Sequence, residues 1–262
     1  MSERKLIFFD IDNTLFCHKE GMSFIPEQTK KAVSMLRKNG HIVAIATGRS
    51  RHLCQRCCDL LEMPCDGVFN NGAQVVFTDK MIENKLSKEL STDIYNYIKN
   101  DDVYIFGAHE DYIFEHGVSE ATYSYVREES GLWGVMKPFP DDSNIPALFS
   151  LTVYGVSGNW HGQKKTMLEF PQIYFCDGYA DIVKKGISKG KGIEICANYF
   201  GFDINDVIAV GDGINDIEMI RKAGLGIAVG NACDELKTVA DMVTDDITRD
   251  GIYKVFKKLE LI

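Results

Sequence analysis

Short apolar segments alternate with amphipathic helical patterns at both ends of this 262-residue chain. Near the N-terminus we expect strands at 6–9, 41–46, 66–69 and 73–77, and helices at 26–39 and 50–62. Near the C-terminus we expect helices at 191–200, 214–223 and 232–240, and strands at 206–210, 225–229 and 241–244. Apolar strands that alternate with helices form a mostly parallel sheet covered on both faces. The sequence therefore predicts a doubly wound α/β core.

The middle of the chain has a different pattern. Segments rich in Tyr and Phe predict strands at 103–108, 112–117, 148–155 and 172–176, and two longer helical patterns separate them. Strands and helices mixed in this way indicate an α+β unit and not a continuation of the parallel sheet. We therefore expect a Rossmann-like core domain made of residues 1–81 and 184–262, with an α+β cap domain, residues 82–183, inserted into it.

Charge and hydropathy limit the partners. The 29 basic and 38 acidic side chains give a formal net charge of −9, which offers no basic field to nucleic acid or to an anionic membrane. No apolar run approaches the ~18 residues of a membrane span, and the N-terminus lacks a signal-peptide pattern. We expect a cytoplasmic protein, a monomer or weak homodimer, with no nucleic-acid or membrane partner.

Polar residues follow several predicted strands of the core. Asp10 and Asp12 follow the first strand, Thr47 follows the second, and Asp212 follows a later one. Ligands of a doubly wound sheet bind outside the carboxyl ends of its strands, so we expect these side chains to lie together. Carboxylates are ligands that Mg²⁺ prefers, and a cation offsets the repulsion between neighbouring acids. The sequence therefore predicts a magnesium site that also attracts phosphate.

Three further residues suit such a site. The amide of Gly48 can approach an anion closely because glycine has no side chain. Lys189 adds a positive charge, and Asp216 stands in the first turn of a predicted helix, where the helix dipole favours a carboxylate. Each stretch alone is equally typical of a turn or a helix cap. Their shared position at one sheet edge favours a joint site.

Two other interpretations of the glycine-rich segments, as a dinucleotide site and as a P-loop, are excluded by particular residues. "VIAVGDGIND" has Asp216 where a dinucleotide site needs its third glycine, and Asp212 would repel a pyrophosphate. "GISKGKG" is not a P-loop, because Gly186 and Gly190 are one residue too close and no Ser or Thr follows Lys191.

A pair of cysteines spaced C-x-x-C raises the question of zinc. No second pair follows at zinc-finger spacing, and Cys54, Cys57 and Cys58 fall on one face of a predicted helix. We expect these cysteines to be buried core residues.

The polar residues resemble the motifs of the haloacid dehalogenase-like phosphatase superfamily. The D-x-D-x-T motif is Asp10, Asp12 and Thr14, the hydroxyl motif is Thr47 in "ATGR", the lysine motif is Lys189 in "ISKG", and the acidic motif is "GDGIND". The place of the large insert, between the second and third motifs, and two phrases of the core, "NNGA" (Asn70 to Ala73) and "AVGNA" (Ala228 to Ala232), are similar to the Cof-type sugar-phosphate phosphatase branch. The resemblance covers residues 5–76 and 186–252, and the insert matches only in place and size.

This resemblance implies a Mg²⁺-dependent phosphomonoester hydrolase. Asp10 would be the nucleophile that becomes an aspartyl phosphate, and Asp12 would act first as general acid and then as general base. For Arg49, apart from the resemblance, we expect an ion pair that braces the loop in preference to the alternative of a contact with the substrate. The implied catalytic residues are Asp10, Asp12, Thr47 and Lys189. The implied metal-site residues are Asp10, Asp12, through its main-chain carbonyl, Asp212 and Asp216. The implied substrate-binding residues are Ile11, Asp12, Thr47, Gly48, Lys189 and Asn215.

The sequence favours one class of substrate but does not name the substrate itself. Residues 82–183 hold a single arginine, Arg127, which favours a compact small phosphorylated metabolite, such as a hexose or pentose phosphate, over a polyphosphate. The cap would close over the strand ends and exclude water. Alternatives are a pyridoxal-phosphate or flavin-phosphate phosphatase, and a phosphomutase or phosphotransferase. A non-catalytic phosphate-binding regulatory module is the most distant alternative, since it needs no nucleophile.

Overall fold

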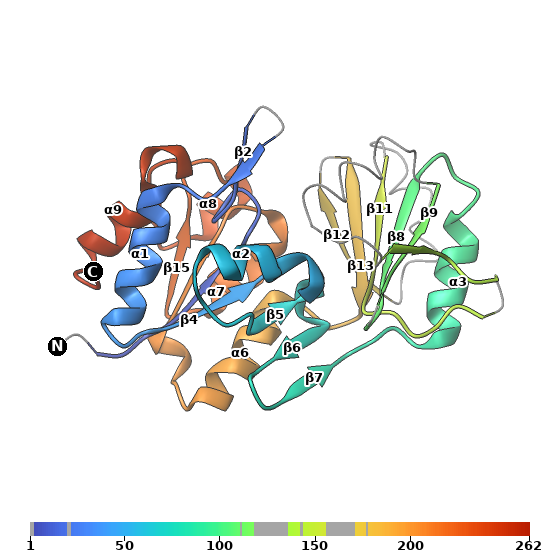
Figure 1. Ribbon diagram of the computed structural model, residues 1–262, viewed down its shortest axis with the longest axis horizontal. Coiled ribbons are helices and arrows are strands. Elements are labelled where there is room, and N and C mark those ends of the chain that lie inside the picture. The colour runs from blue at the N-terminus through green and yellow to red at the C-terminus, as the bar shows by residue number, and fades with distance from the viewer. Residues whose placement is uncertain are drawn as a thin grey trace. The chain divides into compact units, whose positions relative to one another are not determined.

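The computed structural model describes residues 3–19, 22–110, 112–117, 136–141, 144–155, 171–176 and 178–262. The chain divides into two compact units (Figure 1). One, called the core, comprises Met1–Met81 and Ser188–Ile262, and the other, called the inserted unit, comprises Ile82–Ile187. Residues 184–187, which the sequence places in the core domain, belong to the inserted unit in this division.

An eight-stranded sheet forms the centre of the core, in the order β16–β15–β14–β1–β4–β5–β6–β7. Its strands are β1 (Leu6–Phe9), β4 (Ile42–Ala46), β5 (Gly67–Phe69), β6 (Gln74–Val76), β7 (Met81–Glu83), β14 (Val207–Gly211), β15 (Leu225–Ala228) and β16 (Met242–Val243). β1 pairs in parallel with β14 and β4, while β5 and β6 pair antiparallel. β4 with β5, β14 with β15 and β15 with β16 also pair in parallel, and β7 lies beside β6 at the end of the sheet. The prediction of a mostly parallel α/β core is confirmed.

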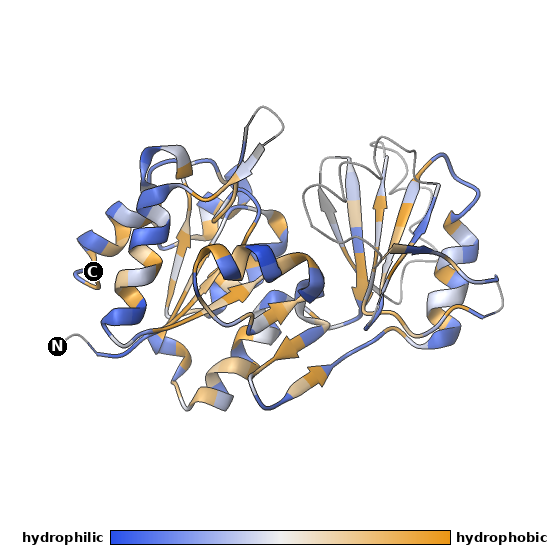
Figure 2. Ribbon diagram, in the orientation of Figure 1, coloured by the Kyte–Doolittle hydropathy of each residue, from blue (hydrophilic) through white to orange (hydrophobic). Residues whose placement is uncertain are grey.

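Strand β1 shows why the sheet forms at this place in the sequence. Its four side chains, Leu6 to Phe9, are fully buried. A parallel strand between two neighbours is covered on both faces and therefore needs a continuous apolar run. Figure 2 shows the hydrophobic residues gathered on the strands at the centre of the core. Burying each such side chain contributes about 1.5–3 kcal/mol, so β1 is a firm support for the acidic residue that follows it.

The core helices are α1 (Glu27–Lys38), α2 (Gln55–Leu60), α6 (Lys189–Phe200), α7 (Ile217–Lys222), α8 (Asp234–Val239) and α9 (Gly251–Lys258). α1 packs against β4 and α9, and α6 packs against β5 and α7. The start of α6 is set by Ser188, whose Oγ accepts a hydrogen bond of 3.1 Å from the Lys191 amide. Such a cap satisfies a free amide of the first turn and holds Lys189 at the first helical position.

The inserted unit is built on a six-stranded mixed sheet in the order β10–β9–β8–β11–β13–β12. Its elements are α3 (Lys88–Ile98), β8 (Tyr104–Ala108), β9 (Ile113–His116), β10 (Met136–Pro138), β11 (Ser150–Tyr154), β12 (Pro171–Cys176) and β13 (Tyr179–Lys184). Alternate residues of the central strands, such as Ile105, Leu151 and Ile182, join Ile94 and Ile98 of α3 in one buried cluster. The predicted α+β insert is confirmed, and the two helical patterns expected between its strands lie outside the described residues.

Several elements were not anticipated from the sequence. A two-stranded hairpin, β2 (Cys17–Lys19) with β3 (Met22–Phe24), follows β1, and β7, β10, β13 and α9 are also additions. The helix expected at 50–62 is a 3₁₀ turn, η1 (Arg51–Cys54), followed by the shorter α2. Asp216 ends a 3₁₀ turn, η4 (Ile214–Asp216), directly before α7, so it is the N-cap residue of the regular helix and not part of its first turn.

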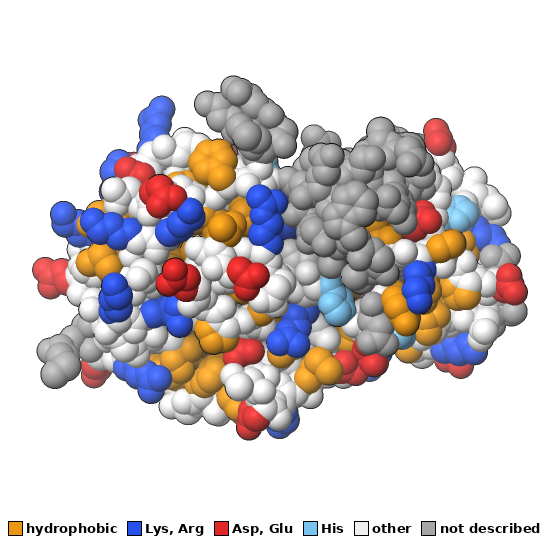
Figure 3. All heavy atoms as spheres, in the orientation of Figure 1, with side chains coloured by type: hydrophobic (Ala, Val, Ile, Leu, Met, Phe, Trp, Pro, Cys, Tyr) orange, Lys and Arg blue, Asp and Glu red, His pale blue; other side chains and the backbone are white. Residues whose placement is uncertain are grey.

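Two further expectations concerned the cysteines and the presence of membrane spans. Cys54, Cys57 and Cys58 are buried and unpaired by disulfides, as expected for core residues. No helix in the described ranges combines the length and the apolar character of a membrane span. Among the described residues on the face shown in Figure 3, basic and acidic side chains are interspersed.

Candidate active site

The residues predicted to act together follow neighbouring strands of the core sheet. Asp10 follows β1, Thr47 follows β4, and Asp212 follows β14. β1 lies between β4 and β14 and runs parallel to both, so the three loops leave the sheet at the same edge. Lys189 reaches this edge from the first position of α6. The topology of the sheet thus brings together residues that are far apart in the sequence.

A buried lysine connects two of the acids. Lys189 Nζ donates hydrogen bonds of 2.6 Å to Oδ1 of Asp10 and of 2.6 Å to Oδ1 of Asp216. The side chains of Lys189 and Asp216 are fully buried, and that of Asp10 is 8% exposed. Burial opposes a charged lysine, but the adjacent Asp10 and Asp216 carboxylates outweigh it and raise the pKa of Lys189 above its usual value. The lysine is therefore a fixed positive charge beside Asp10.

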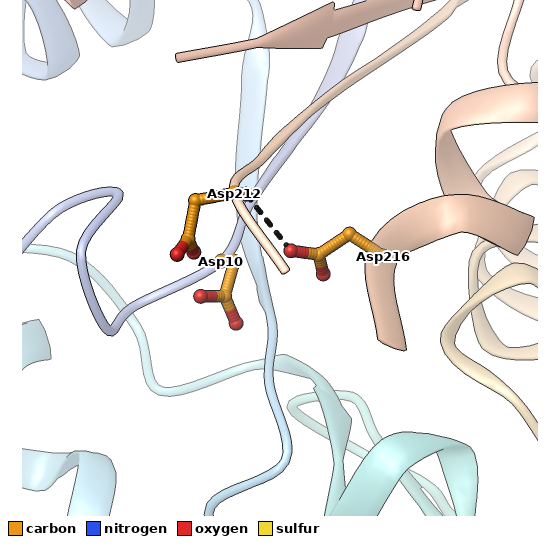
Figure 4. A group of neighbouring side chains, drawn as sticks. All are labelled: Asp10, Asp212 and Asp216. Atoms are coloured by element: carbon orange, nitrogen blue, oxygen red, sulfur yellow. Dashed lines mark hydrogen bonds between the residues drawn. The ribbon is translucent and has the colours of Figure 1, made fainter. Parts of the chain in front are cut away.

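Asp216 is held from both sides. Its Oδ1 faces Lys189, and its Oδ2 accepts hydrogen bonds of 3.0 Å from the amides of Asp212 and Gly213. Figure 4 shows the first of these amide bonds as a dashed line. The Asp212 carboxylate is in turn steadied by Thr14, whose Oγ1 donates to Asp212 Oδ1 at 3.1 Å. Asp216 thus shapes the loop that carries Asp212.

Three carboxylates gather closely enough to hold a metal ion. Asp10, Asp212 and Asp216 each offer a carboxylate oxygen, and these oxygens all lie within 4.8 Å of one another (Figure 4). Among the described residues, none donates a hydrogen bond to Oδ2 of Asp10 or of Asp212. Hard oxygen donors left free in this way suit a small divalent cation. No other group of three potential ligands occurs in the described part of the chain, so the cysteines form no comparable cluster.

The electrostatics of the site also suit a cation. Burial, together with Asp216 and Asp12, raises the pKa of Asp10 to about 7 although Lys189 opposes the shift. Burial, together with Asp10 and Asp216, raises the pKa of Asp212 to about 9. Both shifts report that the acids are costly to ionise in this small volume. A bound cation would remove that cost.

Asp12 lies outside the metal-binding group and has its own partners. Arg49 pairs with it in a bidentate fashion, through Nε to Oδ2 at 2.8 Å and through Nη2 to Oδ1. His18 Nε2 lies 3.0 Å from Oδ1. Burial acts in the opposite direction, but Arg49 and His18 hold the pKa of Asp12 below its usual value. The ion pair expected for Arg49 is present, and its partner is Asp12.

The remaining predicted residues line the loops beside the acids. Thr47 is buried, and its Oγ1 accepts a hydrogen bond of 3.1 Å from the Arg49 amide, while Gly48 is partly exposed. Asn215 Nδ2 donates to Oδ1 of Asn71 at 2.9 Å. The side chain of Ile11 is fully buried, so only its main chain is available to a ligand.

Three residues of this site were missing from the predicted set. Thr14 belongs to the D-x-D-x-T motif, so its contact with Asp212 had a signal in the sequence. Asn71 lies in the "NNGA" phrase, which drew attention to this loop but did not indicate the contact between Asn71 and Asn215. His18 lies on β2, and nothing in the sequence indicated that hairpin.

The mostly parallel sheet, the α+β insert and the buried Asp–Lys–Asp chain agree with the class of phosphatase that the sequence motifs resemble. A family model described as haloacid dehalogenase-like hydrolase matches residues 7–256. The chain belongs to this family, in its Cof-type branch, and is a phosphatase.

Individual relatives cover the whole chain. The Bacillus subtilis protein YkrA is 32% identical over 271 residues, with 99% of each chain covered. The B. subtilis 5-amino-6-(5-phospho-D-ribitylamino)uracil phosphatase YcsE is 25% identical over 256 residues, which are 97% of this chain and 94% of that one. The solved structure of the subclass IIB sugar phosphatase BT4131 has a TM-score of 0.87 and 27% identity, and covers 98% of this chain and 100% of its own.

Proposed function

We propose that this protein hydrolyses small phosphomonoesters, sugar phosphates foremost, through an aspartyl phosphate on Asp10 with Mg²⁺ at the acidic site. The observation that carries the proposal is the 2.6 Å contact between Lys189 Nζ and Asp10 Oδ1. It fixes one oxygen of a buried carboxylate and leaves Oδ2 without a donor among the described residues. A carboxylate held in this way is prepared to act as a nucleophile.

In the first step, an oxygen of Asp10 attacks the phosphorus and the bond from phosphorus to the leaving oxygen breaks. Asp12 donates a proton to that leaving oxygen, so the alcohol departs neutral. Lys189, the Thr47 hydroxyl, the amide of Gly48 and Asn215 are proposed to hold the phosphoryl oxygens. Positioning and charge neutralisation of this kind supply most of the catalysis in phosphoryl transfer.

In the second step, water attacks the phosphorus of the aspartyl phosphate and the bond to Asp10 breaks. Asp12 takes the proton of that water and so returns to its acidic form. The Arg49 and His18 contacts keep Asp12 ionised, which is the form that this second step needs. Donating a proton in the first step requires the ion pair with Arg49 to open.

Mg²⁺ fits the side-chain donors of the group formed by Asp10, Asp212 and Asp216, which are all carboxylate oxygens. Asp10 and Asp212 would hold it, together with the main-chain carbonyl of Asp12. Asp216, whose two oxygens are already engaged, would act through Lys189 and the Asp212 loop. When bound, the ion would offset the negative charge of the acids and of the phosphoryl oxygens.

The proposed substrate is a compact, polyhydroxylated monophosphate. BT4131 is named a sugar phosphatase, and YcsE is named for a substrate with a phosphorylated ribityl chain. Both names specify a phosphate ester of a polyol chain or sugar. The uracil ring in the YcsE name favours, as a second candidate, a substrate that carries an aromatic ring, such as a flavin phosphate or pyridoxal phosphate.

The test is phosphate release from a panel of phosphorylated metabolites, with Mg²⁺ and with EDTA. The panel contains hexose, pentose and ribityl phosphates, flavin and pyridoxal phosphates, and a nucleoside triphosphate. We expect Asp10→Asn to lower kcat by at least about a thousandfold. Asp93→Asn, an exposed change on α3, is the matched control and keeps wild-type activity.

Two results of this activity test would contradict the proposal, and a trapping experiment supplies a third. One is Mg²⁺-independent release, and the other is hydrolysis that survives Asp10→Asn. Acid quenching during turnover should also trap one phosphoryl group on the wild-type chain and none on Asp10→Asn. A wild-type chain that is never phosphorylated would favour direct attack by water over the covalent route.

A further inference from the structure

The turn between β5 and β6, residues Asn70–Gly72, has an unusual backbone. Its three residues form the 3₁₀ turn η2 and all have positive φ, with values of 50°, 54° and 99°. Asn is among the few residues other than Gly that adopt this region readily. All three are also buried. Backbone of this kind persists only where the surroundings hold it, and it concentrates at functional sites.

This turn contacts three loops of the active site. The Asn71 amide donates to the Thr47 carbonyl at 3.0 Å, and the Asn70 amide donates to the Arg49 carbonyl at 3.0 Å. A Cβ on Gly72 would lie 2.2 Å from the carbonyl oxygen of Ser188, so only glycine lets the turn approach the start of α6. The turn contacts the third loop, which carries Asn215, through the side chain of Asn71.

That third contact joins two amide side chains. Asn71 Oδ1 accepts a hydrogen bond of 2.9 Å from Nδ2 of Asn215. Asn71 is fully buried, whereas Asn215 is partly exposed in the loop after β14. The backbone of Asn71 is thus tied to Thr47 and its side chain to Asn215. One residue therefore sets the distance between two loops that are proposed to hold the phosphoryl group.

We infer that Asn71 is a positioning residue that orients the Asn215 amide for phosphate binding. This inference rests on the proposed function, which gives Asn215 a phosphoryl contact. Asn71 need not touch the substrate, because its effect passes through the Asn215 side chain. Its left-handed backbone and its acceptor oxygen are both required, and Asn combines the two.

The residue types at this position allow the two requirements to be separated. Asn71→Gly keeps the backbone freedom and removes Oδ1. Asn70→Gly places a glycine at the neighbouring position of the same turn and leaves Asn71 intact, so it is the matched control for loosening of the backbone.

The experiment measures kcat and KM for p-nitrophenyl phosphate and the inhibition constant of inorganic phosphate, all with Mg²⁺ present. We expect Asn71→Gly to raise KM and the phosphate inhibition constant about fivefold, the size of one lost neutral hydrogen bond, and to change kcat less than twofold. Asn70→Gly should keep the wild-type KM.

A double-mutant cycle tests whether Asn71 acts through Asn215. Asn215→Ala should raise KM at least as much as Asn71→Gly, and the double variant should show no further rise. Fully additive effects, an unchanged KM in Asn71→Gly, or an equal rise in Asn70→Gly would each overturn the inference. Activity that survives Asp10→Asn would instead overturn the proposed function. A wild-type KM in Asn215→Ala, with Asp10→Asn inactive, would remove only the role of Asn215 and with it that of Asn71.

Discussion

Lys189 Nζ lies 2.6 Å from Asp10 Oδ1, although 179 positions separate the two residues in the sequence. The contact joins the end of β1 to the start of α6, on the two sides of the inserted unit in the chain. Because Lys189 also pairs with Asp216, one buried cation compensates two buried carboxylates. The stability of the metal-free core and the chemistry of Asp10 therefore depend on the same side chain.

Replacement of Lys189 by Met should destabilise the metal-free protein. The variant leaves Asp10 and Asp216 buried without their cation, and breaking such a pair from one side costs about 3–5 kcal/mol. Urea unfolding in EDTA measures the free energy of unfolding, and excess Mg²⁺ should recover part of the loss. Lys191→Met is the control, because Lys191 is 59% exposed and the change should cost less than about 0.5 kcal/mol. Equal stabilities of the two variants would contradict a compensating role for Lys189.

Mg²⁺ binding should be linked to pH through Asp10 and Asp212. Their pKa values are raised from 3.8 to about 7 and about 9 in the folded, metal-free protein. Between pH 3.8 and these raised values, the folded state keeps protons that the unfolded chain has released. The free energy of unfolding in EDTA therefore falls as pH rises over this range. The cation binds the ionised carboxylates, so its affinity should rise with pH and its binding should release protons.

Calorimetry in two buffers of different ionisation enthalpy counts those protons directly. Thermal unfolding with EDTA and with Mg²⁺, at about pH 6 and about pH 8.5, should show a larger stabilisation by Mg²⁺ at the higher pH. Asp212→Asn should weaken the pH dependence, whereas the exposed Asp93→Asn should keep it. Mg²⁺ binding without proton release at pH 6 would show that the acids are already ionised there.

Asp12→Asn should separate the two chemical steps. The variant cannot take a proton from water, so the phosphoenzyme should accumulate and steady-state kcat should fall by about 10²–10⁴-fold. An aryl phosphate has a good leaving group that needs little protonation, so rapid mixing should show a burst of one phenolate per site. An alkyl phosphate should give no burst. Absence of the aryl burst, with Asp10 intact, would contradict the separate roles of the two acids.

Arg49→Met should raise the pKa of Asp12. The bidentate contact with Arg49 is the largest influence that favours the ionised carboxyl, and its loss leaves His18 as the remaining partner. Carboxyl ¹³C NMR titration of the metal-free protein measures the shift. Arg51→Met, which removes a hydrogen bond to the Cys65 carbonyl, is a nearby control and should leave the pKa of Asp12 unchanged. An unchanged Asp12 in Arg49→Met would show that the ion pair is too solvated to matter.

The core could be predicted from the sequence because its strands are buried on both faces. "LIFF" at 6–9 and "VIAV" at 207–210 are apolar throughout, and few other structures accommodate such runs between amphipathic helices. The same reasoning places Asp10 and Asp212 at one edge, since parallel neighbours end at the same side of a sheet. These inferences needed only the positions of the strands in the sequence and their parallel direction.

Contacts that depend on irregular loops could not be predicted in this way. The hairpin β2–β3 consists of two three-residue strands without an alternation of apolar and polar residues. Nothing in the sequence therefore indicated that His18 would contact Asp12. The contact between Asn71 and Asn215 depends on a left-handed backbone that many loops containing Asn do not adopt. Side-chain partners across loops are set by tertiary packing, which periodicity does not report.

Gly72→Ala should damage both stability and activity, and Gly201→Ala isolates the backbone contribution. Both glycines have positive φ, 99° and 72°, so alanine strains either position by about 1–2 kcal/mol. A Cβ at 201 meets nothing within 4 Å, whereas one at 72 would meet the Ser188 carbonyl at 2.2 Å. The collision must displace the start of α6, and with it Lys189, so Gly72→Ala should lose more stability and also lower kcat. Urea unfolding and kinetics of both variants check this, and equal losses would show that the close approach of the turn to Ser188 is not needed.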